Sequence, residues 1–562
     1  MELFEEELSG KKLISTFFFE NFKKYKIQSV FLLLSIILSS STLAIQPIIW
    51  SNLLTTLYEN NFEQFKIVLM MTILFYFCKT IISYIQSRII VYLKTNLVMD
   101  IQNRSYQRLL NKKMVYFDSV TSGKILSVLS TDIEQAIEIT FTKLLPAIIS
   151  FFQVILFLIL MFRINVILTA FSILSLPIIL IYYNKKMRNI RKQNVKVKDS
   201  NDSVLSFVQQ SILGIKVIKS FGIKEVQCDQ FIKLASIKAK NMYALQKFVL
   251  FFQTFISMLG VIVELSNYFI GGYFAFTGVI TVEGFIQFSS YSQQLASSSL
   301  SITNIAGNYQ HLLVILNRIE SVRNDDNVTE IFGDRIVEST IESPPSLELV
   351  NVSCEKMGNV ILENINLKIQ RYGLYVIMGP SGSGKTTLVN HILKLYDVNL
   401  GEILINNKNI NLFSERSLRT EITMVSQQVF SFSGSIIDNF RHVNPNIKLS
   451  DIRKYCLDCG IDNEIMGLPK QYQSPILENG NNFSVGQIQR LSVAIALAKE
   501  TSIIVFDEPT SALDVENSIK IKLILEKIKD TKIVILVTHD HSITEKADII
   551  FLLKKKQLLR IR

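Results

Sequence analysis

Charged residues are scarce in this chain, and their scarcity excludes an ordinary soluble protein. Only 19% of the 562 residues are charged, whereas 49% are hydrophobic, and the mean hydropathy is +0.31. A composition this apolar is typical of chains that cross a membrane. The length also exceeds what a single hydrophobic core serves, so we expect at least two domains.

Cysteine is rarer still, with five residues in the chain. An odd, scattered set argues against a disulfide framework. A lone C-x-x-C pair supplies two of the four ligands of a structural zinc site, so plain packing is favoured over a metal or redox site. The acidic run from Glu5 to Glu7 stands where a cleavable signal peptide needs basic residues. The cysteines are Cys78, Cys228, Cys354 and the C-x-x-C pair, Cys456 and Cys459.

Long apolar runs are abundant in the first 320 residues. Each has close to the roughly 20 residues that a helix needs to cross about 30 Å of hydrocarbon. Buried helices of a large soluble protein are the alternative, but runs such as Val154–Phe162 have no polar face, and six of them favour membrane spans. The predicted spans are Ile27–Trp50, Ile67–Ile90, Leu144–Phe162, Val166–Tyr183, Phe248–Phe269 and Thr281–Ile302.

Lysine and arginine gather in two of the connections between these runs. Asn184 to Lys247 holds fourteen of them and Lys94 to Lys143 holds seven, whereas the opposite connections are nearly uncharged. The positive-inside rule therefore predicts that both long connections and both termini are cytoplasmic. This distribution explains the net charge of +11 without nucleic-acid binding. The two connections read as helical, which predicts that the spans continue into the cytosol as rods.

The last predicted span is unusually polar. Polar side chains at membrane depth usually face the bundle interior or a water-filled cavity, and cavity lining is favoured over close packing through serines because three of the residues are glutamines. Lys79 and Glu264 also fall within spans, where either can line a substrate path, although Lys79 can instead snorkel. The polar set is Gln287, Ser289, Ser290, Ser292, Gln293, Gln294, Ser297, Ser298, Ser299, Ser301 and Asn304.

A polar stretch ending in Pro344-Pro345 reads as a domain boundary. The predicted organisation is a six-helix membrane domain with long cytoplasmic extensions over 1–322, a linker over 323–346 and a second domain over 347–562.

The strongest motif of the chain opens this second domain. Gly379 to Thr386 reads GPSGSGKT and fits a phosphate-binding loop, G-x-x-x-x-G-K-[ST]. It follows an apolar strand-like run, Tyr375–Met378, and precedes a helix-like run, Thr387–Lys394. Glycines allow backbone N–H groups to surround phosphate oxygens, and the helix N-terminus adds its positive end. Lys385 is expected to reach the β- and γ-phosphates, and Thr386 to offer its hydroxyl to Mg²⁺.

Carboxylates and a histidine follow two further strand-like runs. Ile503–Phe506 ends at Asp507, a candidate Mg²⁺ ligand, and at Glu508, which can polarise an attacking water. Ile533–Thr538 ends at His539, which can hydrogen-bond the γ-phosphate and that water. An isolated histidine is more often structural, but its place at a strand end beside these motifs favours a functional role.

The ordered set of motifs resembles that of the ATP-binding-cassette (ABC) exporters over nearly the whole chain. Phe483 to Gln487 resembles the L-S-G-G-Q signature. The remaining matches are the Q-loop glutamine Gln427, the D-loop Ser511–Asp514, the exporter X-loop glutamate Glu478, a first coupling segment at Phe117–Gly123 and a second cytoplasmic extension at Gly214–Phe221. The resemblance implies a membrane helical bundle of six spans followed by an α/β P-loop NTPase domain of the ABC type.

The resemblance also implies a role for each matched residue, with ATP and Mg²⁺ as the bound groups. The catalytic set is Glu508, His539 and Gln427, and the metal set is Thr386, Gln427 and Asp507. The nucleotide-binding set is Gly379, Ser381, Gly382, Ser383, Gly384, Lys385, Thr386, Thr387, Ser484, Gly486, Gln487 and Asp514.

One chain cannot complete the implied mechanism. In the family, each ATP lies between the phosphate loop of one cassette and the signature motif of another, so this chain needs a second half-transporter, identical or homologous. Two departures stand out: Lys356 occupies the position of the usual adenine-stacking aromatic residue, and the signature has Val485 in place of its first glycine.

The implied function is ATP-driven export from a bacterial cytoplasm through the plasma membrane, with a peptide, natural product, drug or lipid as substrate. An ATP-gated channel or regulator on the same scaffold is the alternative. The presence of Glu508 and His539 favours repeated hydrolysis and therefore export. An importer is disfavoured because the membrane and ATPase halves are fused.

Overall fold

The computed structural model describes residue 17, residues 21–323 except 60, 174 and 304, and residues 345–562 except 357, 428–429, 478–479, 481, 511–514 and 540. For some residues within helices and strands, among them 175–188 and 356, only the backbone is described. The predicted linker therefore lies almost wholly outside the described residues. Contacts divide the chain into two compact units, Met1–Leu110 with Ser122–Asn324, and Asn111–Thr121 with Asp325–Arg562.

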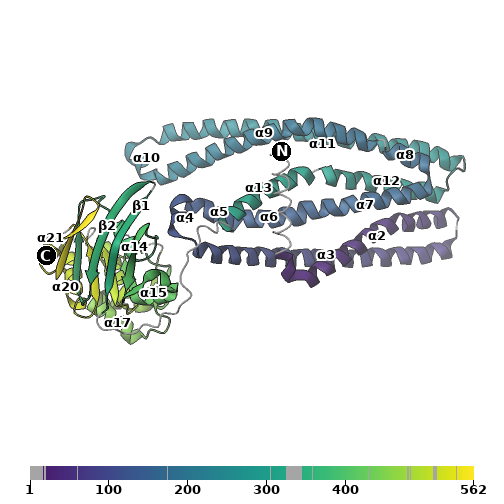
Figure 1. The fold of residues 1–562 in the computed structure, drawn as a ribbon. Helices are drawn as coiled ribbons and strands as arrows, with labels where there is room; N and C mark the ends of the chain where they lie inside the picture. The colour runs from purple at the N-terminus through teal and green to yellow at the C-terminus, as the bar shows by residue number, and fades with distance from the viewer. Residues whose placement is uncertain are drawn as a thin grey trace. The chain divides into compact units, whose positions relative to one another are not determined.

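The first unit is a bundle of long helices, drawn from purple to teal in Figure 1. Among the described residues, four helical segments are long and apolar enough to cross a membrane. Their most apolar windows are between 0% and 28% buried within the chain, so most of the apolar side chains face outward, as lipid contact requires. The segments are Lys23–Tyr58, which contains α2 (Lys26–Tyr58), α3 (Phe62–Leu110), Ser122–Ile164, which ends in α7 (Leu145–Ile164), and α11 (Lys224–Phe276).

These four segments contain four of the six predicted spans. The predicted span Val166–Tyr183 runs through α8 (Val166–Ile173) into α9 (Ser175–Leu213), partly over residues whose side chains are not described. The predicted span Thr281–Ile302 coincides with α12 (Val282–Thr303), whose polar residues lower its hydropathy. As membrane spans, these two stay predictions.

Part of the polar set on α12 fastens this helix to its neighbours. Gln287 Nε2 donates to Ser51 Oγ of α2 over 2.9 Å, and Ser292 Oγ accepts from Asn267 Nδ2 of α11 at 2.6 Å. Gln293 and Ser297, in contrast, are exposed. The predicted cavity-lining set is therefore divided between residues that hold the bundle together and residues on an open face, and Asn304 lies outside the described residues.

The long helices α9 and α11 lie side by side (Figure 1). Their 39 and 53 residues correspond to about 59 and 80 Å, well beyond the thickness of a bilayer. At Gly214 the chain bends by 70° into the short helix α10 (Ile215–Phe221), which ends at Gly222 in the left-handed conformation that glycine adopts without strain.

The second unit is built around a six-stranded sheet. Its order is β12-β11-β3-β10-β9-β6, parallel except for the edge strand β12. Parallel sheets are covered on both faces, and β3, β9 and β10 are buried at every position. The bounds are β3 (Gly373–Met378), β6 (Ile422–Val425), β9 (Ile503–Asp507), β10 (Ile533–Val537), β11 (Ile549–Lys554) and β12 (Gln557–Arg560).

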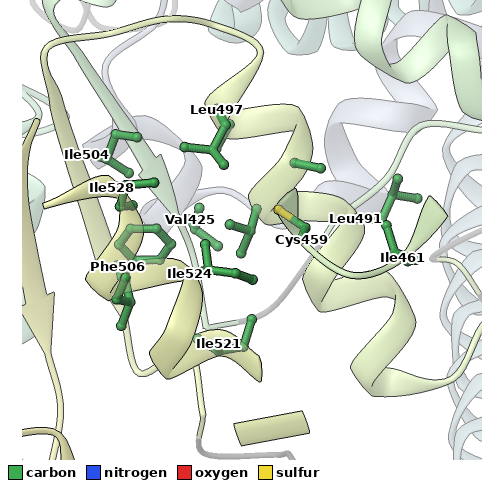
Figure 2. Packing of buried hydrophobic residues seen from close by; sticks show 14 of the residues in the cluster. Val425, Cys459, Ile461, Leu491, Leu497, Ile504, Phe506, Ile521, Ile524 and Ile528 are labelled. Carbon is green, nitrogen blue, oxygen red and sulfur yellow. The ribbon is translucent and has the colours of Figure 1, made fainter. Parts of the chain in front are cut away.

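Hydrophobic clusters cover the two faces of this sheet. Alternate side chains of β3 enter different clusters, Leu374 and Val376 one and Tyr375 and Ile377 the other. Figure 2 shows part of the first cluster, where Cys459 packs among isoleucines and leucines. Cys456 belongs to the same cluster; it carries no disulfide, and burial raises its pKa to about 12, which agrees with the packing interpretation of the C-x-x-C pair.

A second, antiparallel sheet has the order β2-β1-β4-β5. It consists of β1 (Leu347–Lys356), β2 (Asn359–Ile369), β4 (Leu400–Ile405) and β5 (Lys408–Asn409). The same unit contains the short helix α4 (Met114–Ser119), which comes from the loop between α3 and the helices that follow.

Candidate functional site

The strands β3, β10, β9 and β6 bring the predicted site residues to one edge of the sheet. They are parallel neighbours, and Val537 of β10 pairs with both Ile377 of β3 and Asp507 of β9. Because the carboxyl ends of parallel strands meet at one edge, the loops that follow them are adjacent. They are the phosphate loop after β3 and the segments after β10, β9 and β6, which contain His539, Glu508 and Gln427 respectively.

The loop after β3 has the shape of a phosphate cradle. Gly382 and Gly384 have φ values of 76° and 98°, which residues with side chains rarely adopt. A Cβ atom at Gly379 would lie 2.5 Å from the carbonyl oxygen of Leu553, so this position has no room for a side chain.

The polar groups inside this cradle also fit a phosphate. The buried hydroxyl of Ser383 has no hydrogen-bond partner among the described residues. Lys385 begins α14 (Lys385–Ile392) and is 8% exposed; its Nζ donates to the carbonyl oxygens of Gly379 at 2.9 Å and Pro380 at 3.0 Å. An orphaned donor, an ammonium group and a helix N-terminus converge here, and phosphate oxygens satisfy all three.

Thr386 and Asp507 come together beside the loop. The Thr386 side chain hydrogen-bonds to Asp507, a residue that is 4% exposed. Burial raises the pKa of Asp507 above its usual value, although the hydrogen bond from Thr386 and the charge of Lys385 oppose this shift. A hydroxyl and a carboxylate are the oxygen ligands that Mg²⁺ prefers, and the ion commonly takes its remaining ligands from water and substrate phosphates.

Glu508 is the centre of the predicted catalytic set. Gln427 Nε2 donates to Glu508 Oε2 over 3.1 Å, and His539 Nδ1 lies 3.2 Å from Glu508 Oε1. The backbone of Glu508 is held in the left-handed region, at φ 49°, while its N–H donates to the Val537 carbonyl at 2.8 Å. A non-glycine residue in this conformation costs of order 1–3 kcal/mol and is typical of functional sites. The Glu508 carboxylate therefore lies within hydrogen-bonding distance of both an amide and an imidazole.

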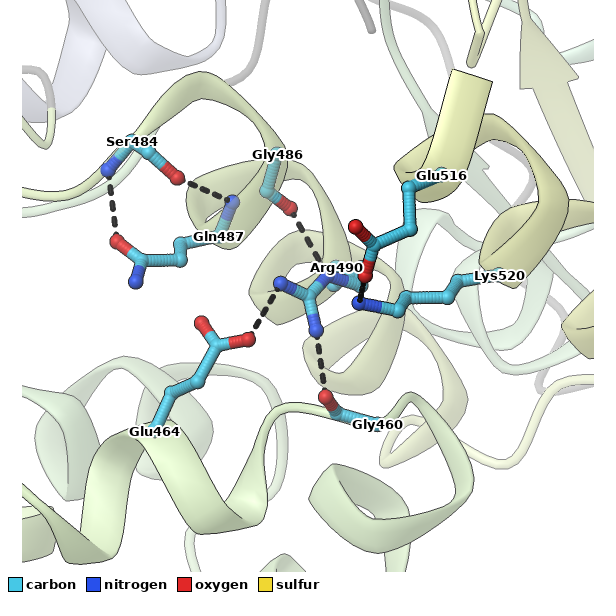
Figure 3. Close-up of polar contacts among 8 residues, drawn as sticks. All are labelled: Gly460, Glu464, Ser484, Gly486, Gln487, Arg490, Glu516 and Lys520. Atoms are coloured by element: carbon cyan, nitrogen blue, oxygen red, sulfur yellow. Dashed lines mark hydrogen bonds and ion pairs between the residues drawn. The ribbon is translucent and has the colours of Figure 1, made fainter. Parts of the chain in front are cut away.

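The signature residues form a separate group at the start of α19 (Val485–Leu497). Ser484 Oγ accepts from the Gln487 backbone N–H at 3.2 Å, and the Gln487 side chain accepts from the Ser484 N–H at 2.8 Å, which makes a capping box (Figure 3). A Cβ atom at Gly486 would lie 2.7 Å from Asn517 Nδ2, so a side chain at this position would displace the Asn517 amide. None of the hydrogen bonds found among the described residues joins this group to the phosphate loop.

Comparison with protein families decides the identity. The model of the ABC transporter transmembrane region matches residues 29–299, and that of the ABC transporter ATPase region, described simply as ABC transporter, matches residues 362–511. The chain belongs to the ABC exporters. It is a half-transporter whose ATP-binding cassette is an ATPase coupled to transport across a membrane. The predicted fold class, a helical membrane region followed by an ABC-type ATPase domain, is confirmed.

Individual relatives agree with this assignment. An ATP-dependent lipid A-core flippase of Syntrophus aciditrophicus (strain SB) is 26% identical over 89% of this chain and 83% of its own length. Bacillus subtilis (strain 168) YgaD, provisionally named a multidrug export ATP-binding/permease protein, is 26% identical over 83% of this chain and 80% of its own. A solved structure of a bacterial Atm1-family ABC exporter with ATP bound has a TM-score of 0.80 at 18% identity, covers 95% of this chain and 94% of its own, and shares the fold.

Two features of the exporter were not found from the sequence. Arg490 is buried on α19, where it donates to the carbonyls of Gly486 and Gly460 and to Glu464 of α18 (Asp462–Met466) at 2.7 Å (Figure 3). A single arginine inside a helical run carries no signal of this network. Its position four residues after Gly486 places its side chain near the Gly486 carbonyl, because residues four apart lie on the same face of a helix.

The second feature is the contact of α4 with the cassette. Tyr396 OH donates to Asp118 Oδ2 over 2.9 Å, and Lys113 Nζ lies 2.7 Å from Asp397 Oδ2. Burial, with the carboxylate beside it, raises the pKa of Tyr396 to about 12. The sequence marked the segment around Phe117 but not its cassette partners, which belong to no motif. Three further predicted residues, the Lys356 side chain, Glu478 and Asp514, lie outside the described residues.

Proposed function

We propose that the chain works as one half of a dimeric exporter that hydrolyses ATP at Glu508 and carries an amphipathic substrate out of a bacterial cell. The observation that supports this most is the Glu508 carboxylate, which meets Gln427 and His539 beside the phosphate loop. A carboxylate held this way can accept a proton from an attacking water, while the amide and imidazole orient that water. Repeated hydrolysis suits an exporter better than a regulator.

The remaining site residues bind and position the nucleotide. Lys385, Ser383 and the backbone N–H groups of the loop hold phosphate oxygens, and Thr386, Asp507 and Gln427 hold Mg²⁺. When bound, Mg²⁺ neutralises charge on the phosphate oxygens and orients them for in-line attack. The rest of the phosphate-loop set is Gly379, Ser381, Gly382, Gly384 and Thr387.

A second half-transporter completes each site. Ser484, Gly486 and Gln487 would contact the γ-phosphate held by the partner cassette, with Asp514 beside them. The capping box fixes the Ser484 side chain and the start of α19, so these groups are held in place before the cassettes meet.

Contacts of α4 with Tyr396 and Asp397 would carry movement of the cassette to the membrane helices. The basic connections favour a plasma-membrane orientation with both termini in the cytoplasm.

The exposed polar face of α12, with Gln293 and Ser297, would line the substrate path. The functions for which these relatives are named, lipid A-core flipping and multidrug export, favour an amphipathic drug or lipid over a peptide.

Reconstitution tests the proposal. The purified chain in sealed liposomes should accumulate a fluorescent amphiphile against its gradient when Mg²⁺-ATP is supplied on the cassette side, and Glu508→Gln should abolish accumulation. An ion current without accumulation would instead support an ATP-gated channel and contradict export.

A further inference from the structure

Two membrane helices of this exporter share a polar cluster, which lies near the middle of the apolar run of α3 and at the end of the run predicted on α2. Gln46 and Trp50 lie one turn apart on α2, and Tyr76 and Lys79 lie one turn apart on α3. Lys79 Nζ donates to Gln46 Oε1 over 2.6 Å and lies 5.7 Å from the centre of the Tyr76 ring. Trp50 Nε1 donates to Tyr76 OH over 2.7 Å. We call these four residues the Lys79 cluster.

On α3, Lys79 lies near the middle of the apolar run. It is twelve residues after Ile67 and eleven before Ile90, the ends of the apolar run, so about 18 and 17 Å of helix separate it from either end. A four-carbon stem is much shorter than these distances. An ammonium group at this depth is costly unless it faces water, a counter-charge or a ligand.

No carboxylate within the described part of the chain forms a salt bridge with Lys79, and its amide partner carries no charge. Glu264, a carboxylate within the predicted span Phe248–Phe269, accepts a hydrogen bond from Tyr268 of its own helix at 3.0 Å. The positive charge of Lys79 is therefore left for an anion from outside the described part of the chain.

The surrounding groups match that need. The Gln46 oxygen accepts from Lys79, which leaves the amide N–H groups as donors, and the Tyr76 oxygen accepts from Trp50, which leaves its own hydrogen. Ammonium, amide and phenol thus present hydrogen-bond donors together. Phosphate or carboxylate oxygens accept such bonds, and charge-assisted ones are the strongest.

We propose that the Lys79 cluster binds the anionic head group of an amphiphile whose apolar part lies along α3. The most apolar window of α3 is only 6% buried, and Phe77 beside the cluster is 65% exposed, so a hydrocarbon chain finds an apolar surface there. The proposal names the substrate class of the export function proposed above, on which its role in transport rests.

The cluster carries its own probe, because Trp50 is the only tryptophan of the chain. The full-length chain in phosphatidylcholine nanodiscs is titrated with dodecyl phosphate while Trp50 fluorescence is recorded. We expect a saturable change, with at least tenfold weaker binding of the zwitterionic dodecylphosphocholine, about 1.4 kcal/mol. Equal binding of the two amphiphiles overturns the proposal without any variant, and equal binding of inorganic phosphate overturns its amphiphile part.

Variants then assign the charge. Lys79→Gln should weaken dodecyl phosphate binding at least tenfold, Lys79→Arg should restore it to within about threefold, and Lys66→Gln, at the start of the same helix, should not change it. Unchanged affinity in Lys79→Gln overturns the proposal. Equal, non-additive losses of thermal stability in Lys79→Gln and Glu264→Gln would assign Lys79 to a carboxylate pair and also overturn it.

ATPase activity of the same wild-type nanodiscs separates this proposal from the export function. Selective binding without any ATP hydrolysis contradicts export and leaves the anion site standing. Hydrolysis without selective binding contradicts the anion site alone.

Discussion

His539 Nδ1 lies 3.2 Å from Glu508 Oε1, although the two residues are 31 positions apart. Each follows a strand of the central sheet, and β9 and β10 are parallel neighbours, so their carboxyl ends place the two side chains together. The Glu508 N–H also donates to the carbonyl of Val537, the last residue of β10, so the start of the Glu508 loop is tied to the strand that precedes His539. The site is therefore fixed by strand pairing as well as by its side chains.

Glu508→Gln should remove turnover while ATP still binds. The amide keeps the size of the carboxylate and can still contact Gln427 and His539, but it cannot accept a proton, so ATPase activity should fall at least 10²-fold, the scale of a general base. Phosphate release by the purified transporter measures turnover, and a fluorescent nucleotide measures binding. Glu516→Gln, an exposed glutamate on α20 (Val515–Ile528), is the control. Near-normal hydrolysis in Glu508→Gln would sink the assignment.

Much of this site was predictable because its chemistry is local in sequence. The strand–loop–helix context around Lys385 and the buried runs ahead of Asp507 and His539 each need only a few adjacent residues, and the structure contains all three strands. What the sequence does not contain is which distant groups meet. The bond from Gln427 to Glu508 depends on β6 pairing with β9, and no single segment records that pairing.

The membrane half shows the same limit. Hydropathy located the long apolar helices, but it could not tell which polar residues of α12 face other helices. Ser292 is buried against Asn267, whereas Ser297, little more than one turn further on, is exposed. The division depends on how the helices pack, which neither helical periodicity nor composition predicts.

Arg490→Met should destabilise the signature motif. The change leaves the carbonyls of Gly460 and Gly486 and the carboxylate of Glu464 without their donor, at about 1–3 kcal/mol for a buried unsatisfied group. We expect a lower melting temperature of the detergent-purified transporter and a loss of ATPase activity. Arg490→Lys should recover only part of both, because one ammonium cannot replace the guanidinium at three acceptors. A melting curve identical to that of the wild type would contradict this role.

Tyr396→Phe combined with Asp118→Asn should uncouple hydrolysis from transport. The pair removes the hydrogen bond between α4 and the cassette but touches no site residue. We expect basal ATPase activity within about twofold of the wild type and a several-fold lower ratio of substrate moved to ATP hydrolysed in proteoliposomes. Tyr455→Phe, which removes a tyrosine–glutamate bond to Glu500 elsewhere in the cassette, should leave this ratio unchanged. Equal ratios in both variants would show that the α4 contact plays no part in coupling.

Val485 bears on whether the partner is a second copy of this chain. If the first signature glycine were needed for a backbone conformation that only glycine adopts easily, a β-branched residue there would be strained. Val485 shows no such strain: it is the first residue of α19 and does not have a positive φ. It is also 57% exposed, so its side chain is not crowded. The capping box around it is intact, and Gly486, where a Cβ atom would meet the Asn517 amide, matches the second glycine of the signature pattern. We therefore predict that the chain expressed alone forms a homodimer, the commonest assembly of identical subunits, and hydrolyses ATP at two equivalent sites.

Mass measurement of the detergent-purified protein and ATPase titration check this, and Val485→Gly should change turnover by less than about threefold. A monomer that becomes active only when a different half-transporter is co-expressed would overturn the prediction.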